Sequence, residues 1–343
     1  MIYLDYQATT PLAPEARDAM MQWLDGPGGT GFGNPHSAHR MGRQAAAAIE
    51  LARERVAALL PSGGRVIFTS GATEAIDTAI LGTGGNVLAC ATEHAAVLDC
   101  ADAVEAEGRS FEVIDVRKDG QASLDNLRAA ANKDTGLIAA MVVNNEIGTI
   151  NPIANIVPIA RENGALLLTD AVQAFGRIVI PGGVDFIAVS AHKIHGPKGV
   201  GALWVRDGVD VEPLLHGGGQ EGGLRSGTLS PALCAGFGAA AHVASERMEE
   251  DAEHIQQLWN RAREMFADWE LNGSETARWQ GNLNVRKAGL DVNRLMSEVR
   301  DVCFSAGSAC ASGSGRTSHV LRAIGLEAEQ AKSSIRLGFG RYT

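Results

Sequence analysis

The sequence predicts an α/β fold in which a large domain with a mostly parallel seven-stranded sheet is joined to a smaller α+β domain. One reason is length, because 343 residues exceed the usual size of one domain and can bury two cores. Another is the regular alternation of short apolar runs with helical stretches as far as Val205. The third is the change of this pattern from Pro231 onward, where the alternation stops.

The predicted strands of the large domain are short apolar runs, and most of them are separated by a helical stretch. The strands lie at 65–70, 86–92, 111–116, 137–144, 165–171, 185–191 and 201–205. The helices lie at 14–25, 41–60, 73–81, 96–108, 123–133 and 153–164. Strands that alternate with helices imply right-handed crossovers and a sheet covered by helices on both faces.

The pattern of the C-terminal part is different and predicts the smaller domain. It comprises a helical region at 236–269, strands at 282–286, 302–305 and 334–338, and helices at 291–299 and 318–324. We therefore expect a large domain over residues 13–248 and a small domain made of residues 1–12 and 249–343.

Charge and cysteine usage exclude several classes of function. The formal net charge is −10 and the pI is near 5.4, so no overall positive field attracts nucleic acid or an anionic membrane. The N-terminus has no secretory signal pattern, and the five cysteines are odd in number and widely spaced. We therefore expect a reduced, cytoplasmic protein without a disulfide framework or metal site, in which local groups hold any anion.

Lys193 is the first candidate catalytic residue. It lies in Ser190-Ala191-His192-Lys193-Ile194-His195-Gly196-Pro197, where a buried strand breaks into a turn. Desolvation and nearby cations lower the pKa of a lysine, and its neutral amine can then form a Schiff base with an aldehyde. A solvated turn lysine is the alternative, and for an isolated lysine it would be the better interpretation.

Polar residues follow several other predicted strands, at the edge where a parallel sheet binds its ligands. Thr73 follows Gly71-Ala72 at a helix start, which suits either a phosphate site or an ordinary helix cap. His94 is either a satisfied core histidine or a ring stacked on an aromatic cofactor. Asp170 ends an apolar strand and needs a cation, either a pyridinium nitrogen or a basic side chain.

Cys310 differs from the other cysteines. It lies in Gly307-Ser308-Ala309-Cys310-Ala311-Ser312-Gly313, a run of small residues that cannot bury it. An accessible thiol near cationic groups carries enough thiolate to act as a nucleophile. We interpret Cys90, Cys100, Cys234 and Cys303 as small buried residues.

Together these features resemble a known family, the cysteine desulfurases of the NifS/IscS type in the fold-type I, class V group of pyridoxal-phosphate enzymes. The resemblance extends from residue 3 to the last predicted strand. The stretches that carry it are 3–11, 32–35, 69–74, 92–94, 143–148, 192–199, 216–221, 225–229, 307–310 and 334–336. Ala191 and His195 depart from the family pattern but leave every chemical role filled.

The resemblance implies a role for each candidate residue. Lys193 would carry pyridoxal 5'-phosphate covalently, and His94 would stack on its ring and serve in proton transfer. Asp170 would pair with the ring nitrogen and Gln173 with the phenolic oxygen. The implied phosphate ligands are Ala72, Thr73, Ser190 and His192, with Thr228 contributed by the partner of a homodimer. Asn145 and Arg336 would orient the substrate carboxylate, with Asn34 also in the substrate site.

The implied reaction converts L-cysteine to L-alanine and leaves a persulfide on Cys310. The sulfur would pass to an iron–sulfur scaffold or another acceptor protein, for cluster assembly, thio-cofactor synthesis or tRNA thiolation. Two other activities stay open at this point, those of a selenocysteine lyase and of a class V aminotransferase. A non-enzymatic alternative is an idle scaffold subunit that keeps the fold.

Overall fold

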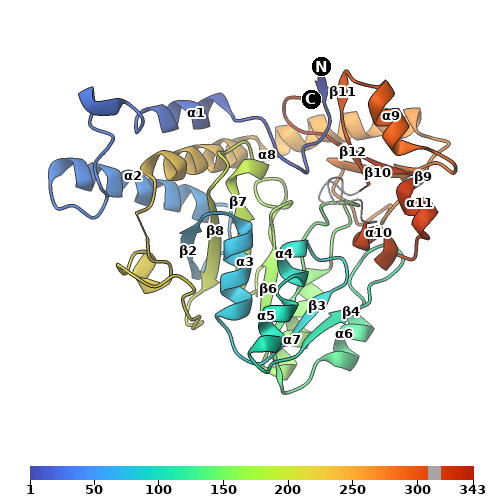
Figure 1. Cartoon of the computed structure of the whole chain (residues 1–343), viewed down its shortest axis with the longest axis horizontal. Helices are drawn as coiled ribbons and strands as arrows, with labels where there is room; N and C mark the ends of the chain where they lie inside the picture. The colour runs from blue at the N-terminus through green and yellow to red at the C-terminus, as the bar shows by residue number, and fades with distance from the viewer. Residues whose placement is uncertain (308–317) are drawn as a thin grey trace.

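The computed structural model describes residues 1–307 and 318–343, and its centre is a seven-stranded sheet (Figure 1). The strand order is β2-β8-β7-β6-β5-β3-β4. The bounds are β2 Gly64–Thr69, β3 Asn86–Cys90, β4 Phe111–Ile114, β5 Thr135–Ala139, β6 Leu166–Asp170, β7 Phe186–Ser190 and β8 Gly201–Arg206.

All strands of this sheet except β8 run in the same direction. The pairs β4–β3, β3–β5, β5–β6 and β6–β7 are parallel, whereas β8 is antiparallel to both of its neighbours. β8 reverses because residues 191–200 are too few for the crossover that a parallel pair requires. The carboxyl ends of β2, β3, β5, β6 and β7 therefore meet at one edge, as the sequence predicted.

Helices cover both faces of the sheet, because the strands alternate their apolar side chains between two cores. One core contains Ile67, Val87 and Leu168 and packs against α3, α4 and α5. The other contains Phe68, Leu88 and Leu167 and packs against α1, α2, α6, α7 and α8. The bounds are α1 Pro14–Met21, α2 Arg40–Ala57, α3 Ala72–Leu81, α4 Ala95–Leu98, α5 Ala101–Ala106, α6 Leu124–Ala130, α7 Ile153–Asn163 and α8 Pro231–Met265.

A second group of elements lies beside the large sheet at the upper right of Figure 1, next to both chain ends. Its four-stranded sheet has the order β12-β13-β10-β9, and β1 forms a separate parallel pair with β11. The strands are β1 Ile2–Tyr3, β9 Glu270–Leu271, β10 Asn282–Arg286, β11 Val302–Cys303, β12 Ser305–Ala306 and β13 Ser334–Gly338. The helices are α9 Val292–Glu298, α10 His319–Ala323 and α11 Ala328–Lys332. Leu283, Val285, Ile335 and Leu337 form its core with the C-terminal part of α8.

The fold class is confirmed, but several predicted bounds are wrong. The predicted helix 96–108 is two helices, α4 and α5, separated at Asp99 and Cys100. The predicted strand 137–144 ends at Ala139, although the N–H groups of Ala140 and Val142 still donate to the carbonyls of Leu168 and Asp170, while Met141 and Val143 line a cavity. The predicted strand 302–305 is divided between β11 and β12, which belong to different sheets. In the described ranges no helix is both long and apolar enough to cross a membrane.

Candidate active site

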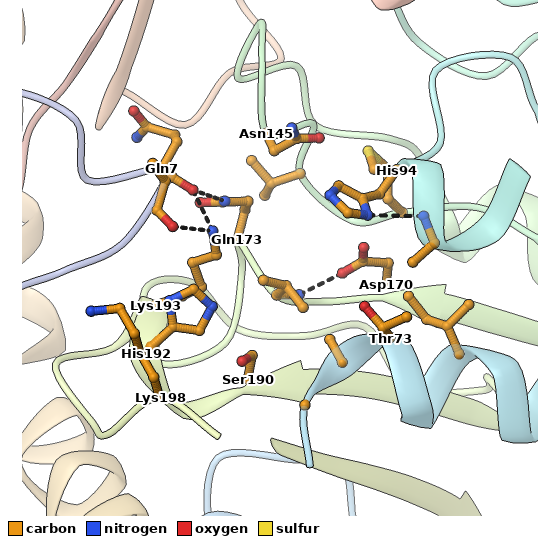
Figure 2. Close-up of a pocket in the computed structure, with 18 of the residues that line it drawn as sticks. Gln7, Thr73, His94, Asn145, Asp170, Gln173, Ser190, His192, Lys193 and Lys198 are labelled. Carbon is orange, nitrogen blue, oxygen red and sulfur yellow. Dashed lines mark hydrogen bonds between the residues drawn. The ribbon is translucent and has the colours of Figure 1, made fainter. Parts of the chain in front are cut away.

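A cavity of about 410 Å³ lies beyond the carboxyl ends of the parallel strands (Figure 2). Segments far apart in sequence form its wall, and most of the predicted site residues lie there. The lining residues are Gln7, Ala8, Ser70, Gly71, Ala72, Thr73, Ile76, His94, Ala96, Met141, Val143, Asn145, Asp170, Val172, Gln173, Ser190, His192, Lys193, Lys198, Gly199 and Arg336.

Lys193 lies one short turn beyond β7, at the end of the 3-10 helix η2 (Ala191–Lys193). Its ammonium donates to the carbonyl oxygens of Gln7 at 2.6 Å and Ala8 at 2.7 Å. Thr10 holds the same turn from both sides, because its hydroxyl donates to the His192 carbonyl and accepts the His195 N–H. The N-terminal segment thus fixes the lysine that the sequence identified.

One end of the cavity is suited to an anion. Helix α3 begins there after Gly71, and within the described ranges no side chain caps its first turn. Its free N–H groups and partial positive charge therefore face the cavity. Thr73 is in the second position of the helix and is not its cap, which favours the phosphate interpretation over the ordinary cap. Lys198, on the loop before β8, adds a cation to the wall.

His192 is uncharged at neutral pH. Burial and, to a smaller extent, the neighbouring cations Lys193, Lys198 and Arg177 lower the pKa of its imidazole to about 4. Its Nδ1 lies 3.1 Å from the Thr9 hydroxyl, which fixes the ring. His192 can therefore hydrogen-bond to an anion, while the positive charge comes from the lysines.

Two carboxyl groups are buried in this region, and one of them, that of Asp170, lines the cavity. Asp170 ends β6 and accepts the Val172 N–H at 2.8 Å (Figure 2). Burial raises the pKa of Asp170, although His94, this N–H and Lys193 partly counteract the rise. Glu93 is fully buried and accepts the Met141 N–H at 2.7 Å. Burial raises its pKa to about 8, and nearby Asp170 contributes, so Glu93 is mostly protonated at neutral pH.

The ring of His94 and the side chain of Lys193 line different sides of the same cavity (Figure 2). His94 is the N-cap of α4, and its Nδ1 accepts the Ala96 N–H at 3.1 Å. Because Nδ1 is an acceptor, the neutral ring carries its proton on Nε2. The cap thus determines which nitrogen can exchange a proton.

Gln173 is oriented by contacts at both ends of its amide. Its Nε2 donates to the Gln7 carbonyl at 3.0 Å, and its Oε1 accepts from Arg177 at 2.6 Å. Arg177 also donates to the Lys193 carbonyl at 2.6 Å and stacks 4.5 Å from the centre of the Trp279 ring. Burial lowers the pKa of Arg177 to about 9.

Arg336 and Asn145 meet at another part of the wall. Arg336 on β13 has a side chain only 1% exposed and donates to the Asn145 carbonyl at 3.1 Å. Its second contact is an ion pair with Asp5 at 2.8 Å. Arg336 Nε and Asn145 Oδ1 are buried without a hydrogen-bond partner among the described residues. Unmet polar groups of this kind cost about 1–3 kcal/mol each, so the wall is suited to a polar ligand.

These residues fit pyridoxal phosphate, which forms a Schiff base with a lysine amine and carries a basic ring nitrogen and a phosphate. Lys193 supplies the amine, and Asp170 supplies a buried carboxylate that a pyridinium would stabilise in its charged form. The uncapped start of α3 can receive the phosphate. Each functional part of the cofactor thus has a complementary group in one cavity.

Two of the predicted site residues that the structure describes, Asn34 and Thr228, are not brought to this cavity. Asn34 is exposed and its side chain accepts the His36 N–H at 2.9 Å, and Thr228 is also exposed. Neither belongs to the wall. Cys310 falls outside the described residues. Conversely, sequence reasoning assigned no role to Gln7, Ala8 or Lys198, although the stretch 3–11 was part of the resemblance.

Comparisons with known proteins agree with this geometry. The family model described as Aminotransferase class-V matches residues 2–343. The cysteine desulfurase IscS of Rickettsia akari is 41% identical over 360 residues, covering 100% of this chain and 87% of that protein. The solved structure of a NifS-like protein superposes with a TM-score of 0.90 at 31% identity, covering 100% of this chain and 94% of the other.

A further solved structure, SspA in complex with cysteine, superposes with a TM-score of 0.87 at 33% identity and covers 99% of both chains. The family model, the relative and the two solved structures all extend over nearly the whole chain. The chain therefore belongs to the class-V aminotransferase family, and within it to the pyridoxal-phosphate-dependent cysteine desulfurases of the NifS/IscS type.

Proposed function

We propose that this cavity converts L-cysteine to L-alanine and that Cys310 receives the sulfur. The observation that carries the proposal is the convergence of Lys193, His94, Asp170 and the uncapped start of α3 on one cavity. SspA, which superposes on 99% of this chain, was solved in complex with cysteine, and this supports the choice of substrate.

In this proposal the wall residues divide the work of holding the cofactor. Lys193 binds it covalently, Asp170 faces the ring nitrogen, His94 faces the ring and Gln173 faces the phenolic oxygen. Ala72, Thr73, Ser190 and His192 hold the phosphate. When bound, pyridoxal phosphate supplies an electron sink for the bonds broken at the substrate's α- and β-carbons. Asn145 and Arg336 bind the substrate carboxylate, with Asn34 near the entrance.

Two side chains move protons. Lys193 Nζ, once substrate has displaced it, takes the proton from the substrate's α-carbon, and the carbonyls of Gln7 and Ala8 can accept hydrogen bonds from the resulting ammonium. His94 Nε2 is the second group, and it acts as a donor, because Nδ1 accepts the Ala96 N–H and the proton of the neutral ring therefore lies on Nε2. The exchangeable proton of the neutral ring is therefore on the nitrogen that does not cap helix α4.

The sulfur step needs no further reactant. The Cys310 thiolate attacks the sulfur of the substrate, an S–S bond forms, and the carbon–sulfur bond breaks with its electron pair going to carbon. The carbon takes a proton and becomes the methyl group of alanine. One L-cysteine and one protein thiol thus give one L-alanine and one protein persulfide.

We further propose a homodimer in which Thr228 completes the phosphate site of the partner subunit. Support comes from exposed apolar side chains close in sequence to Asn34, since Met21, Leu24 and Phe32 are 56%, 58% and 65% exposed. The proposed domains are residues 13–248 and residues 1–12 with 249–343, which makes α8 a continuous link between them.

The persulfide sulfur would go to an iron–sulfur scaffold or another acceptor protein, in the cytoplasm. The thiols of Cys90, Cys100, Cys234 and Cys303 are free, and the first three are buried. Free thiols suit a reducing compartment. A pull-down with and without prior persulfide loading of Cys310 tests this part of the proposal, because an acceptor should be retained preferentially by one of the two forms.

The deciding assay measures alanine and sulfide from L-cysteine in the presence of a thiol reductant. Cys310→Ala should abolish sulfide release, whereas full release by this variant would refute the proposal. If Cys310→Ala formed alanine from selenocysteine as fast as the wild-type protein does, a selenocysteine lyase would be favoured. Amino transfer to a keto acid would favour an aminotransferase. A colourless protein that cannot be reconstituted with cofactor would favour an idle scaffold.

A further inference from the structure

We propose that Asp5 determines how tightly this site holds the carboxylate that substrate and product share, by offsetting the charge of Arg336. This inference depends on the role proposed above for Arg336 and extends it to a positioning residue at the opposite end of the chain. Asp5 is not among the site residues that the sequence predicted.

Asp5 and Arg336 form a largely buried ion pair at the edge of the cavity. Asp5 Oδ1 accepts from Arg336 Nη2 at 2.8 Å, and the side chains are 19% and 1% exposed. The Ser305 hydroxyl donates to the same carboxylate oxygen at 2.9 Å. Charge-assisted bonds of this length orient both partners.

The backbone delivers Asp5 to this position. Asp5 pairs with Gly338 in an isolated parallel bridge, and the Gly338 N–H donates to the Leu4 carbonyl at 2.7 Å. Gly338 is two residues beyond Arg336 in β13, so the strand that presents the arginine also holds the chain that presents the aspartate. The pairing of β13 with the N-terminal segment therefore fixes the ion pair in place.

The guanidinium retains donors after it has bound Asp5. Nη1 donates to the Asn145 carbonyl at 3.1 Å, and Nε is buried without a hydrogen-bond partner among the residues that the structure describes. Arg336 also lines the cavity. A ligand carboxylate can thus bind Arg336 without displacing Asp5.

Charge then decides the affinity. A buried guanidinium without a counterion attracts any carboxylate strongly, whereas one already paired with Asp5 attracts it less. L-cysteine and L-alanine have the same amino and carboxylate groups, so tight carboxylate binding would retain the product after each turnover. Asp5 offsets that attraction and favours release of alanine.

The test compares two ligands of the holoenzyme by the change in visible absorption of the bound cofactor. L-alanine carries the carboxylate, and ethylamine does not. In Asp5→Asn, which keeps an acceptor for Arg336 but removes the charge, the dissociation constant for L-alanine should fall about tenfold, equivalent to about 1.4 kcal/mol. That for ethylamine should change less than about twofold, because it contains no group for Arg336.

A matched control is available in the ion pair between Arg341 and Asp251, with 2.7 Å between the atoms and side chains 4% and 16% exposed. Asp251→Asn removes an equivalent charge without touching Arg336 and should alter neither dissociation constant. If Asp5→Asn fails to load cofactor, Ser305→Ala removes one anchor of Asp5 and should shift alanine binding in the same direction, but less.

Unchanged or weaker alanine binding in Asp5→Asn would overturn the proposal, as would an equal gain in Asp251→Asn. The ligand comparison requires neither Cys310 nor carbon–sulfur cleavage. A wild-type protein that binds alanine more tightly than ethylamine but releases no alanine from L-cysteine would therefore refute the desulfurase function alone.

Discussion

His94 accepts the backbone N–H of Ala96 through ring Nδ1, at 3.1 Å, and so caps helix α4. This contact occupies Nδ1 and leaves Nε2 for chemistry. The same side chain thus has a structural duty at Nδ1 and a proposed chemical duty at Nε2. Because the two duties use different atoms, they can be separated by substitution.

His94→Asn should preserve the cap and remove the proton carrier. Asparagine is among the preferred N-cap residues, so α4 and the thermal stability should be retained. Alanine formation from L-cysteine should fall by about 10²–10⁴-fold, the usual contribution of a positioned acid or base. Steady-state kinetics with cofactor content from visible absorption checks this, and an activity within about twofold of wild type would exclude proton transfer by His94.

Asp170→Asn should have opposite effects on the cofactor-free and the cofactor-loaded protein. Burial raises the pKa of Asp170, so an uncharged amide at this position should make the cofactor-free protein at least as stable as wild type. The loaded enzyme should lose turnover by about 10²–10³-fold, because the charge that faces the ring nitrogen is gone. Melting curves of the cofactor-free protein and steady-state kinetics of the loaded enzyme test this, and a destabilised cofactor-free variant would show that Asp170 has a structural ion partner instead.

Thr73→Val should weaken binding of the phosphate end of the cofactor. Its hydroxyl lies in the first turn of α3 and lines the cavity. The dissociation constant for pyridoxal phosphate should rise about tenfold, equivalent to one hydrogen bond to a charged group, whereas binding of pyridoxal, which lacks the phosphate, should not change.

Thr78→Val is the matched control in the same helix, since the Thr78 hydroxyl donates to the Glu74 carbonyl at 2.7 Å and lies away from the cavity. This control should bind both compounds as wild type does. Equal losses for pyridoxal and pyridoxal phosphate in Thr73→Val would argue against a phosphate contact.

Glu93 makes the cofactor-free protein less stable as pH rises. Its carboxyl has a pKa of about 8 in the fold against 4.5 for an unperturbed glutamate, so between these values the folded state binds more protons than the unfolded state. The contribution of Glu93 to the free energy of unfolding therefore falls from about pH 5 to pH 8, by at most about 1.4 kcal/mol per pH unit.

Glu93→Gln removes this titration, so its stability relative to wild type should increase steadily over that interval in denaturant unfolding experiments. Glu74→Gln gives the contrasting control. The ion pair of Glu74 with Arg225, with 2.8 Å between the atoms, helps to lower the pKa of that carboxyl despite its partial burial. The control should lose stability near neutral pH, and a pH-independent difference for Glu93→Gln would contradict a buried, protonated Glu93.

The local sequence predicted the large sheet and the residues at its edge well. Apolar runs that end in Asp170 and Ser190 show both where a strand lies and where it stops, because burial dictates their composition. Since parallel strands share one edge, placing these ends together required no long-range information.

The contributions of the N-terminal segment could not be predicted in the same way. Gln7 and Ala8 bind Lys193 through backbone carbonyls, which no side-chain pattern encodes, and they are more than 180 residues from it in sequence. Asp5 meets Arg336 only because β13 pairs with the start of the chain. Strand 137–144 was predicted too long because Met141 and Val143, which line the cavity, are as apolar as the strand residues before them.

The most direct test of the account follows the sulfur atom. The holoenzyme is mixed with an equimolar amount of L-cysteine without reductant, and alanine is quantified while peptide mass spectrometry locates any added sulfur. We predict stoichiometric alanine and one added sulfur on Cys310, with neither product in Cys310→Ser. Alanine formation by Cys310→Ser at the wild-type rate, or sulfur on Cys303 in place of Cys310, would contradict the central claim.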